Sequence, residues 1–223
     1  MTRTPLALRP LPNYTRGEEC MNMVTHIVGG GFGILALLLG LLQAIVHRDP
    51  LAVLCAAIYG GSMIALYTVS SVYHGLRTNI SKKVMQVIDH CTIYFLIAGT
   101  YTPIVLCSLR PKYPAIGWGL FALEWGLLII AVTLTAIDLK KYNVFSMICY
   151  IGMGWAVIPF WKQTMDVLVT TGFALLLSGG IAYTIGAVLY GIGSRKKWMH
   201  SVFHIFVVLG SVLQFIPVLL YVL

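Results

Sequence analysis

Two histidines lie one helical turn apart near the C-terminal end of the chain, at His200 and His204. Residues spaced i and i+4 lie on the same face of a helix, so both imidazoles can reach one metal ion. His74 follows Ser70 at the same spacing in an earlier apolar segment and can supply a third nitrogen. Three histidines and one open position are typical of a catalytic zinc site. The pattern therefore predicts zinc bound by His74, His200 and His204.

Asp89 and Ser70 are the side chains that could do chemistry beside such an ion. Asp89 falls a short way into the third apolar run, where an ionisable residue is costly and is therefore a functional candidate. Zinc lowers the pKa of a bound water to about 7, and a carboxylate can accept a proton from that water or orient it. A serine hydroxyl can hydrogen-bond the oxyanion that develops on a carbonyl substrate. We therefore predict that Asp89 and Ser70 are catalytic.

Four other ionisable residues have simpler explanations. His90 is one residue from Asp89 and points about 100° away, so we expect it to pack or to be hydrogen-bonded. We expect His26 to be structural and to donate to Asp89 or to a backbone carbonyl. Glu124 lies near the middle of the fourth apolar run and is expected to be protonated or hydrogen-bonded inside the protein. Only His47 is expected at the opposite end from the other histidines.

The elements that position these residues are long apolar runs. A hydrocarbon core requires about 20 residues of helix, and the runs lack the period-two alternation of a β-barrel. We predict an all-α polytopic membrane protein, a bundle of seven transmembrane helices. Residues 1–21 would form a short cytoplasmic segment and residues 22–223 a single transmembrane domain. The predicted helices are residues 23–46, 51–74, 83–109, 114–137, 142–161, 167–190 and 197–223.

The composition excludes other classes of protein. The 223 residues are 59% hydrophobic and only 10% charged, whereas a soluble domain carries about 25% charged residues. The net charge of +8 does not indicate nucleic-acid binding, because the 15 basic residues form short clusters between apolar runs. Such clusters are topology signals and partners for anionic lipid head groups. The five cysteines include no CxxC pair, so we expect free thiols.

The distribution of Lys and Arg predicts the orientation in the membrane. If the N-terminus is cytoplasmic, that side carries 11 of the 15 basic residues, including Arg3 and Arg195. Positive charges concentrate on the cytoplasmic side, so we expect the N-terminus inside and the C-terminus outside. Asp89 and five of the six histidines then share one cytoplasmic-side layer. The remaining basic residues, on the outer side, are Arg48, Arg110, Lys112 and Lys162.

Four segments of the chain resemble the signatures of hemolysin III-related proteins, the bacterial branch of the progestin and adipoQ receptor family, which includes the adiponectin receptors. They are residues 17–26, 70–74, 89–103 and 200–204. The resemblance implies a seven-helix bundle with a cytoplasmic N-terminus and zinc held by the three histidines. It also implies that Asp89 and Ser70 are the family's nearby carboxylate and hydroxyl. The receptors are linked to ceramide hydrolysis, and alkaline ceramidases share the Ser, Asp and three-histidine pattern.

Three functions remain compatible with this pattern. The first is a ceramidase-like zinc hydrolase that acts on amide or ester bonds of membrane lipids in the plasma membrane. The second is a receptor or sensor without enzymatic activity, in which zinc is structural and joins the second and seventh helices. The third, a pore-forming cytolysin, follows from the family name and ranks lowest, because so apolar a chain has no water-soluble form. The substrate and the oligomeric state stay open.

Overall fold

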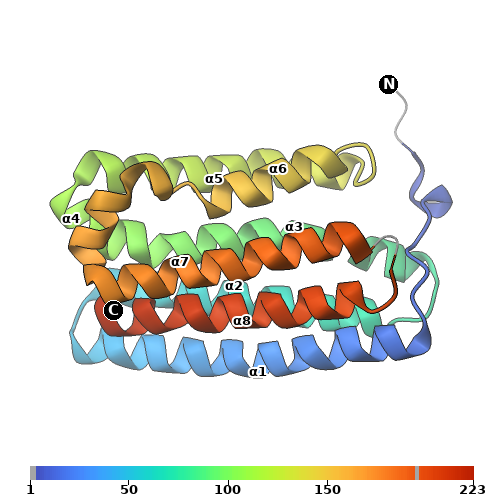
Figure 1. Ribbon diagram of the computed structural model, residues 1–223, viewed down its shortest axis with the longest axis horizontal. Coiled ribbons are helices and arrows are strands. Elements are labelled where there is room, and N and C mark those ends of the chain that lie inside the picture. Colours follow the sequence, from blue (N-terminus) through green and yellow to red (C-terminus); the bar gives the residue numbers. More distant parts are fainter. Residues whose placement is uncertain (1–3, 194–195) are drawn as a thin grey trace.

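The computed structural model describes residues 4–193 and 196–223, and all regular secondary structure in these ranges is helical (Figure 1). Arg3 and Arg195, which contribute to the predicted charge bias, lie outside the described residues. The all-helical fold class is confirmed. The elements are η1 (Leu6–Leu8), α1 (Arg16–Val46), α2 (Pro50–Gly75), α3 (Ile80–Pro103), the π-helix η2 (Ile104–Leu109), α4 (Arg110–Lys112), α5 (Pro114–Ile137), α6 (Asn143–Gly154), η3 (Ile158–Phe160), α7 (Trp161–Gly193) and α8 (Met199–Tyr221).

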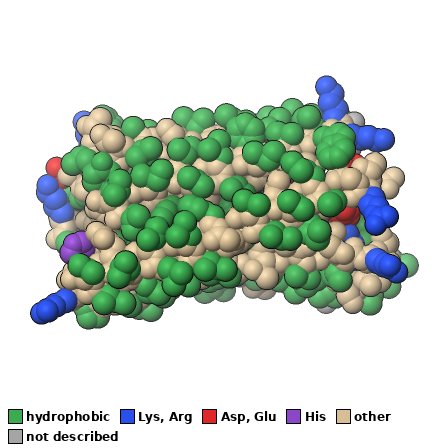
Figure 2. Space-filling model, turned by 90° about the horizontal axis from the view of Figure 1, so that it is seen from below, with side chains coloured by type: hydrophobic (Ala, Val, Ile, Leu, Met, Phe, Trp, Pro, Cys, Tyr) green, Lys and Arg blue, Asp and Glu red, His purple; other side chains and the backbone are tan. Residues whose placement is uncertain are grey.

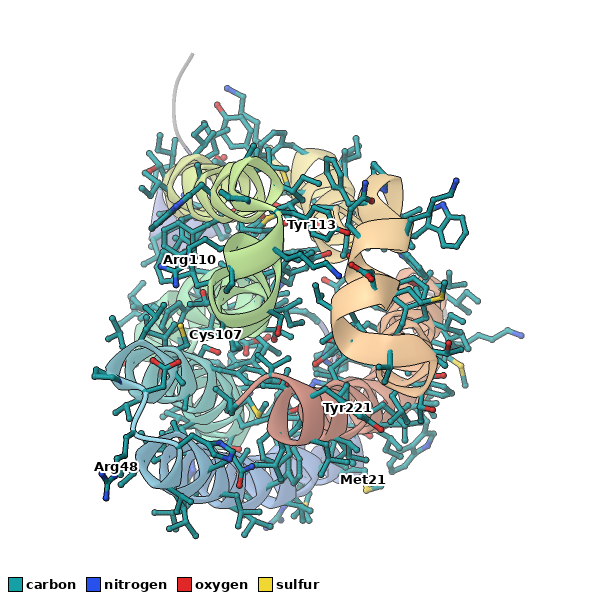
Figure 3. All side chains as sticks on the ribbon, turned by 90° about the vertical axis from the view of Figure 1, so that its left-hand side faces the viewer. Met21, Arg48, Cys107, Arg110, Tyr113 and Tyr221 are labelled. Atoms are coloured by element: carbon teal, nitrogen blue, oxygen red, sulfur yellow. The ribbon has the colours of Figure 1, made fainter. Side chains whose placement is uncertain are left out.

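The long helices run side by side along one axis, and the chain termini lie at opposite ends of the bundle (Figure 1). α1 packs against α2 and α8, while α3 packs against α2 and α5. α7 lies along α8. The turn between α1 and α2, which contains Arg48, and α4, which contains Arg110, lie at the end of the bundle opposite the N-terminal segment (Figure 1), the end that faces the viewer in Figure 3. Basic residues predicted for the outer side therefore share one end of the bundle.

Six stretches of the described chain are long and apolar enough to cross a membrane. One of them, Asn143–Ile192, has 50 residues and contains both α6 and α7. The chain reverses direction between α6 and the long part of α7, which follows a kink at Val169 (Figure 1). The membrane-spanning character is confirmed, whereas the count of seven crossings stays a prediction. Apolar side chains cover the flank of the bundle and charged ones gather at its two ends (Figure 2). The six stretches are Arg16–Val46, Pro50–Gly75, Ile80–Lys112, Pro114–Ile137, Asn143–Ile192 and Met199–Tyr221.

The start of α1 is fixed by a capping box. The Thr15 side chain accepts a hydrogen bond from the Glu18 backbone N–H, and the Glu18 carboxylate accepts one from the Thr15 backbone N–H. Such reciprocal bonds satisfy two donors that the first turn of a helix leaves unpaired. The cap sets the position of the first turns of α1, which pass beside the predicted zinc site.

All five cysteines are free thiols, as expected.

Candidate metal centre

The three histidines of the predicted zinc site converge at one end of the bundle. His74 ends α2, and His200 and His204 occupy the first turns of α8. One nitrogen from each ring lies within 4.8 Å of the other two, and the Nε2 atoms of His200 and His204 are 3.1 Å apart. Zn–N bonds of about 2.0–2.1 Å place tetrahedral ligands about 3.3 Å apart. The histidine cluster therefore has the size and donor type of a zinc site, although the identity of the metal stays a prediction.

Hydrogen bonds behind two of the rings, those of His74 and His204, engage Nδ1 and leave Nε2 on the side of the cluster. Nδ1 of His74 lies 2.6 Å from Oε2 of Glu19, and the buried Nε2 of His74 has no partner among the described residues. Nδ1 of His204 lies 3.2 Å from the backbone oxygen of Asn22. A carboxylate or carbonyl on one nitrogen fixes the tautomer and the orientation of a metal-ligating histidine. The orphaned Nε2 of His74 is what a metal ligand would show.

The helix α1 supplies these partners, and the sequence analysis missed them. Glu19 also accepts from Nζ of Lys82 on α3 at 2.6 Å. The Asn22 side chain accepts from the Ser201 hydroxyl at 2.6 Å. A signal was present in the sequence: Glu19, Asn22 and His26 recur at intervals of three and four residues, which puts polar groups on one face of an otherwise apolar helix. That face of α1 points at the histidine cluster.

Asp89 and Ser70, the predicted catalytic pair, lie in the wall of a cavity that begins at the histidines. The Ser70 hydroxyl interacts with the Asp89 carboxyl. His90, in the same wall, is hydrogen-bonded as expected: its Nδ1 lies 2.8 Å from the Gln86 backbone oxygen. The structure thus brings Asp89 and Ser70 into the same cavity wall as His200 and His204.

One expectation about these polar residues was wrong, and another is narrowed to one of its two alternatives. His26 makes no hydrogen bond to Asp89 or to a backbone carbonyl; instead its ring stacks on His204, with 3.7 Å between ring centroids. Glu124 is fully buried in α5, but neither of its carboxyl oxygens has a hydrogen-bond partner within the described chain. Packing against the rings of His204 and Tyr67 fixes His26 without a polar partner. For Glu124, a protonated carboxyl stays the prediction. Glu124 is not among the residues that line the cavity.

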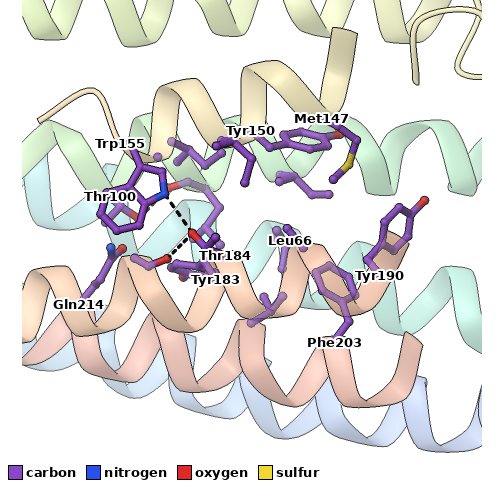
Figure 4. Close-up of a pocket in the computed structure, with 18 of the residues that line it drawn as sticks. Leu66, Thr100, Met147, Tyr150, Trp155, Tyr183, Thr184, Tyr190, Phe203 and Gln214 are labelled. Carbon is purple, nitrogen blue, oxygen red and sulfur yellow. Dashed lines mark hydrogen bonds between the residues drawn. The ribbon is translucent and has the colours of Figure 1, made fainter. Parts of the chain in front are cut away.

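The cavity is lined by His200 and His204 and extends along the inside of the bundle. Figure 4 shows its wall from Tyr190 and Phe203 to Trp155 and Gln214. On α8 it is lined from His200 to Gln214, a distance of about 21 Å at 1.5 Å per residue. Most of the wall is apolar or aromatic, and its deep end carries a Trp155 indole that donates to the Thr184 hydroxyl at 3.0 Å. The cavity is therefore long and mainly apolar, with the histidines and Asp89 at one end and Thr184 and Gln214 at the other.

The segment before α1 covers the histidine cluster at the end of the bundle. The Tyr14 ring lies nearly parallel to that of His200, with 4.9 Å between centroids and 20° between planes. Burial, followed by the nearby Tyr190, raises the pKa of Tyr14 well above its ordinary value. Nearer the N-terminus, Arg9 anchors the same segment to the bundle by donating a hydrogen bond to the Ile137 backbone oxygen at 2.8 Å. The Tyr14 ring therefore packs on His200 at this end of the bundle.

The fold and the cluster define a polytopic α-helical membrane protein with a three-histidine centre at one end of its bundle. The family model described as haemolysin-III related matches residues 14–215, which include every residue of that centre. The chain therefore belongs to the haemolysin-III related family, as the resemblance of its motifs predicted.

Individual relatives agree with this assignment. The chain is 37% identical over 206 residues to a protein named Hemolysin-3 from Bacillus cereus, covering 92% of each chain. It is 33% identical to the Hemolysin-3 homolog of Bacillus subtilis (strain 168), covering 93% of this chain and 96% of that one. Similarity extends to human monocyte to macrophage differentiation factor, at 27% identity over 89% of this chain and 82% of the human protein.

Proposed function

We propose that this protein is a zinc-dependent hydrolase that cleaves an amide or ester bond of an acyl lipid, as ceramidases do. The observation that carries the proposal is the position of the histidine cluster at the end of a long apolar cavity, with Asp89 in the same wall. An acyl chain in the cavity would place its carbonyl group at the end where the histidines, Asp89 and Ser70 meet. Membrane lipids are therefore the partners that we expect.

The residues of the chain would divide the work of hydrolysis. Zinc, held by His74, His200 and His204, would supply Lewis acidity and an acidic water. Asp89 would accept the proton of the attacking water and return it to the leaving amine or alcohol. Ser70, beside Asp89, would hold the carboxylate in position and donate to the substrate oxygen. The apolar wall would exclude other water from the reacting carbonyl.

Turnover of acyl lipids by the purified protein tests this proposal. We expect hydrolysis of a ceramide or another acyl lipid, its loss with a chelator and its recovery with added zinc. Asp89→Asn should abolish turnover and keep the bound metal, because Asp89 is not one of the cluster ligands. Equal rates with and without chelator, or no turnover of any acyl lipid by zinc-loaded protein, would reject the hydrolase.

A receptor or sensor with structural zinc is the second candidate. This candidate is favoured because the three histidines come from two helices. A metal bound by them would connect the end of α2 to the start of α8. In that case His204→Ala should lower the melting temperature while no lipid is turned over. An unchanged melting temperature in this variant would argue against structural zinc.

For the orientation we propose seven crossings of the plasma membrane, with the N-terminus cytoplasmic and the C-terminus outside. The support is the bias of Lys and Arg, together with termini at opposite ends of the bundle, which require an odd number of crossings (Figure 1). Reporter fusions at the two termini test this: a C-terminal alkaline phosphatase should be active and an N-terminal one inactive. Activity of the N-terminal fusion would reverse the orientation.

A further inference from the structure

His26 is a buried imidazole whose two nitrogens have no hydrogen-bond partner within the described chain. The residue is only 3% exposed, and its ring forms part of the cavity wall that also contains Asp89 and Ser70. Buried polar side-chain atoms in native proteins are nearly always paired, and each exception requires an explanation. The missing partner of His26 is therefore expected from outside the chain.

Within the described chain, the His26 ring packs against two other aromatic rings. One face stacks on His204 at 3.7 Å and 16°, and Tyr67 approaches it with its ring at 5.1 Å and 78°. Tyr67 is itself fixed by a 2.6 Å hydrogen bond to Ser211. Gly29, one turn along α1, permits this approach, because a Cβ there would lie 2.6 Å from the Tyr67 ring. The imidazole is held in one place while both of its nitrogens stay uncommitted.

The other histidines at this end of the bundle show what is different about His26. His74 also has an unpartnered nitrogen, but that ring belongs to the metal cluster, and His26 does not. His90 lies in the cavity wall too, but its Nδ1 is 2.8 Å from the Gln86 backbone oxygen. His26 thus differs from the other histidines of the cavity wall. It belongs neither to the metal cluster nor to a hydrogen bond with a backbone carbonyl of the described chain.

We propose that His26 donates a hydrogen bond to the carbonyl oxygen of an acyl lipid bound in the cavity, an inference that rests on the proposed function. An imidazole carries at least one N–H in either tautomer. A carbonyl oxygen is an acceptor that amides, esters and fatty acids share, and the alkyl chain fits the apolar wall beyond. A donor fixed beforehand at this position costs no reorganisation when the lipid binds. His26 is then a substrate-binding residue.

The test uses a long-chain methyl ketone, which has the carbonyl group but no bond to hydrolyse, and the matched alkane, which lacks the carbonyl. Binding of both is measured calorimetrically on the zinc-loaded full chain in detergent. His26→Phe keeps a ring for stacking but has no donor, whereas His26→Gln keeps a donor. His47→Phe is the matched control, since His47 bonds to the Leu223 backbone oxygen at the other end of the bundle.

We expect the Kd for the ketone to rise about fivefold in His26→Phe, as the loss of one hydrogen bond predicts. The Kd for the alkane and the zinc content should not change, and His26→Gln and His47→Phe should bind as the wild type does. The proposal is overturned if His26→Phe binds the ketone normally, if it loses zinc, or if the wild type does not prefer the ketone. Because no turnover is needed, ketone binding without lipid hydrolysis would reject the hydrolase and retain the role of His26.

Discussion

The Glu19 carboxylate lies 2.6 Å from Nδ1 of His74 and leaves the other nitrogen of that ring to face the histidine cluster. The second oxygen of the same carboxylate lies 2.6 Å from Nζ of Lys82. Lys82 in turn donates to the Leu76 backbone oxygen at 3.0 Å. One carboxylate thus connects α1, α2 and α3 directly behind the His74 ring. A carboxylate in this position also makes the histidine a stronger ligand.

Glu19→Gln should weaken zinc binding by about 10- to 100-fold, the usual loss when a hydrogen-bond partner of a ligating histidine is removed. The measurement is competition for zinc with a chelator of known affinity. Glu18→Gln is the matched control, since Glu18 accepts from the Thr15 and Trp198 backbone N–H groups and has no hydrogen bond to a histidine among the described residues. It should lower the melting temperature without changing the zinc affinity. Equal zinc affinities in the two variants would contradict this role of Glu19.

His74→Ala should remove bound zinc, whereas His90→Ala should retain it. Both rings are at the same end of the bundle, but only the His74 nitrogen lies within 4.8 Å of those of His200 and His204. With two ligands left, a tetrahedral site closed by water loses most of its affinity. Elemental analysis of the purified variants measures the metal per chain. Full zinc occupancy in His74→Ala would place the metal elsewhere.

The histidine cluster could be predicted because the positions of its residues follow from spacing within single apolar runs. The i, i+4 pair of His200 and His204 fixes their common face, and counting residues from the end of each apolar run puts His74 at the same depth. The partners on α1 have no such local signature. Glu19 is 55 residues from His74, and Asn22 is 182 residues from His204. Their contacts depend on which helices pack together, which periodicity within one helix does not specify.

The fifth predicted helix, residues 142–161, shows why the ends of helices could not be predicted from the sequence. The structure ends α6 at Gly154 and resumes with the 3₁₀ turn Ile158–Phe160, which contains Pro159. The backbone groups freed by this break are satisfied from α3: the Tyr101 hydroxyl donates to the Gly154 oxygen and accepts from the Val157 N–H, both at 3.1 Å. The hydropathy of residues 142–161 shows an unbroken apolar run and does not reveal the break. The hydroxyl that compensates for the break belongs to Tyr101, which is distant in the sequence.

The N-terminal segment should detach from the bundle in acid. Asp138, between α5 and α6, accepts a hydrogen bond from the Lys141 backbone N–H and another from that of Thr4, and these bonds lower its pKa from the ordinary value of 3.8. A carboxyl whose pKa is lower in the folded state stabilises that state above its ordinary pKa and loses this contribution as the pH falls through the folded value.

Limited proteolysis with pepsin, which works in acid, measures this release. Cleavage near Thr4 and Arg9 should increase steeply as the pH drops below the ordinary value of 3.8. Asp138→Asn should already be cleaved more readily above that pH and should show a flatter dependence on pH. A wild-type segment that stays protected throughout, or an unchanged profile in the variant, would show that Asp138 does not anchor it.

Two adjacent glycines of α2 should respond in opposite ways to the same substitution. A Cβ on Gly60 would lie 2.6 Å from Cβ and 2.7 Å from Cα of Leu37, so α1 and α2 would have to move apart. Overpacking of this kind costs about 1–3 kcal/mol. A Cβ on Gly61 meets nothing within 4 Å, and alanine is favoured over glycine in a helix by up to about 1 kcal/mol. Gly60→Ala should therefore lower the melting temperature in detergent, and Gly61→Ala should leave it unchanged or raise it. Similar melting temperatures for the two variants would mean that α1 and α2 do not pack this closely at Gly60.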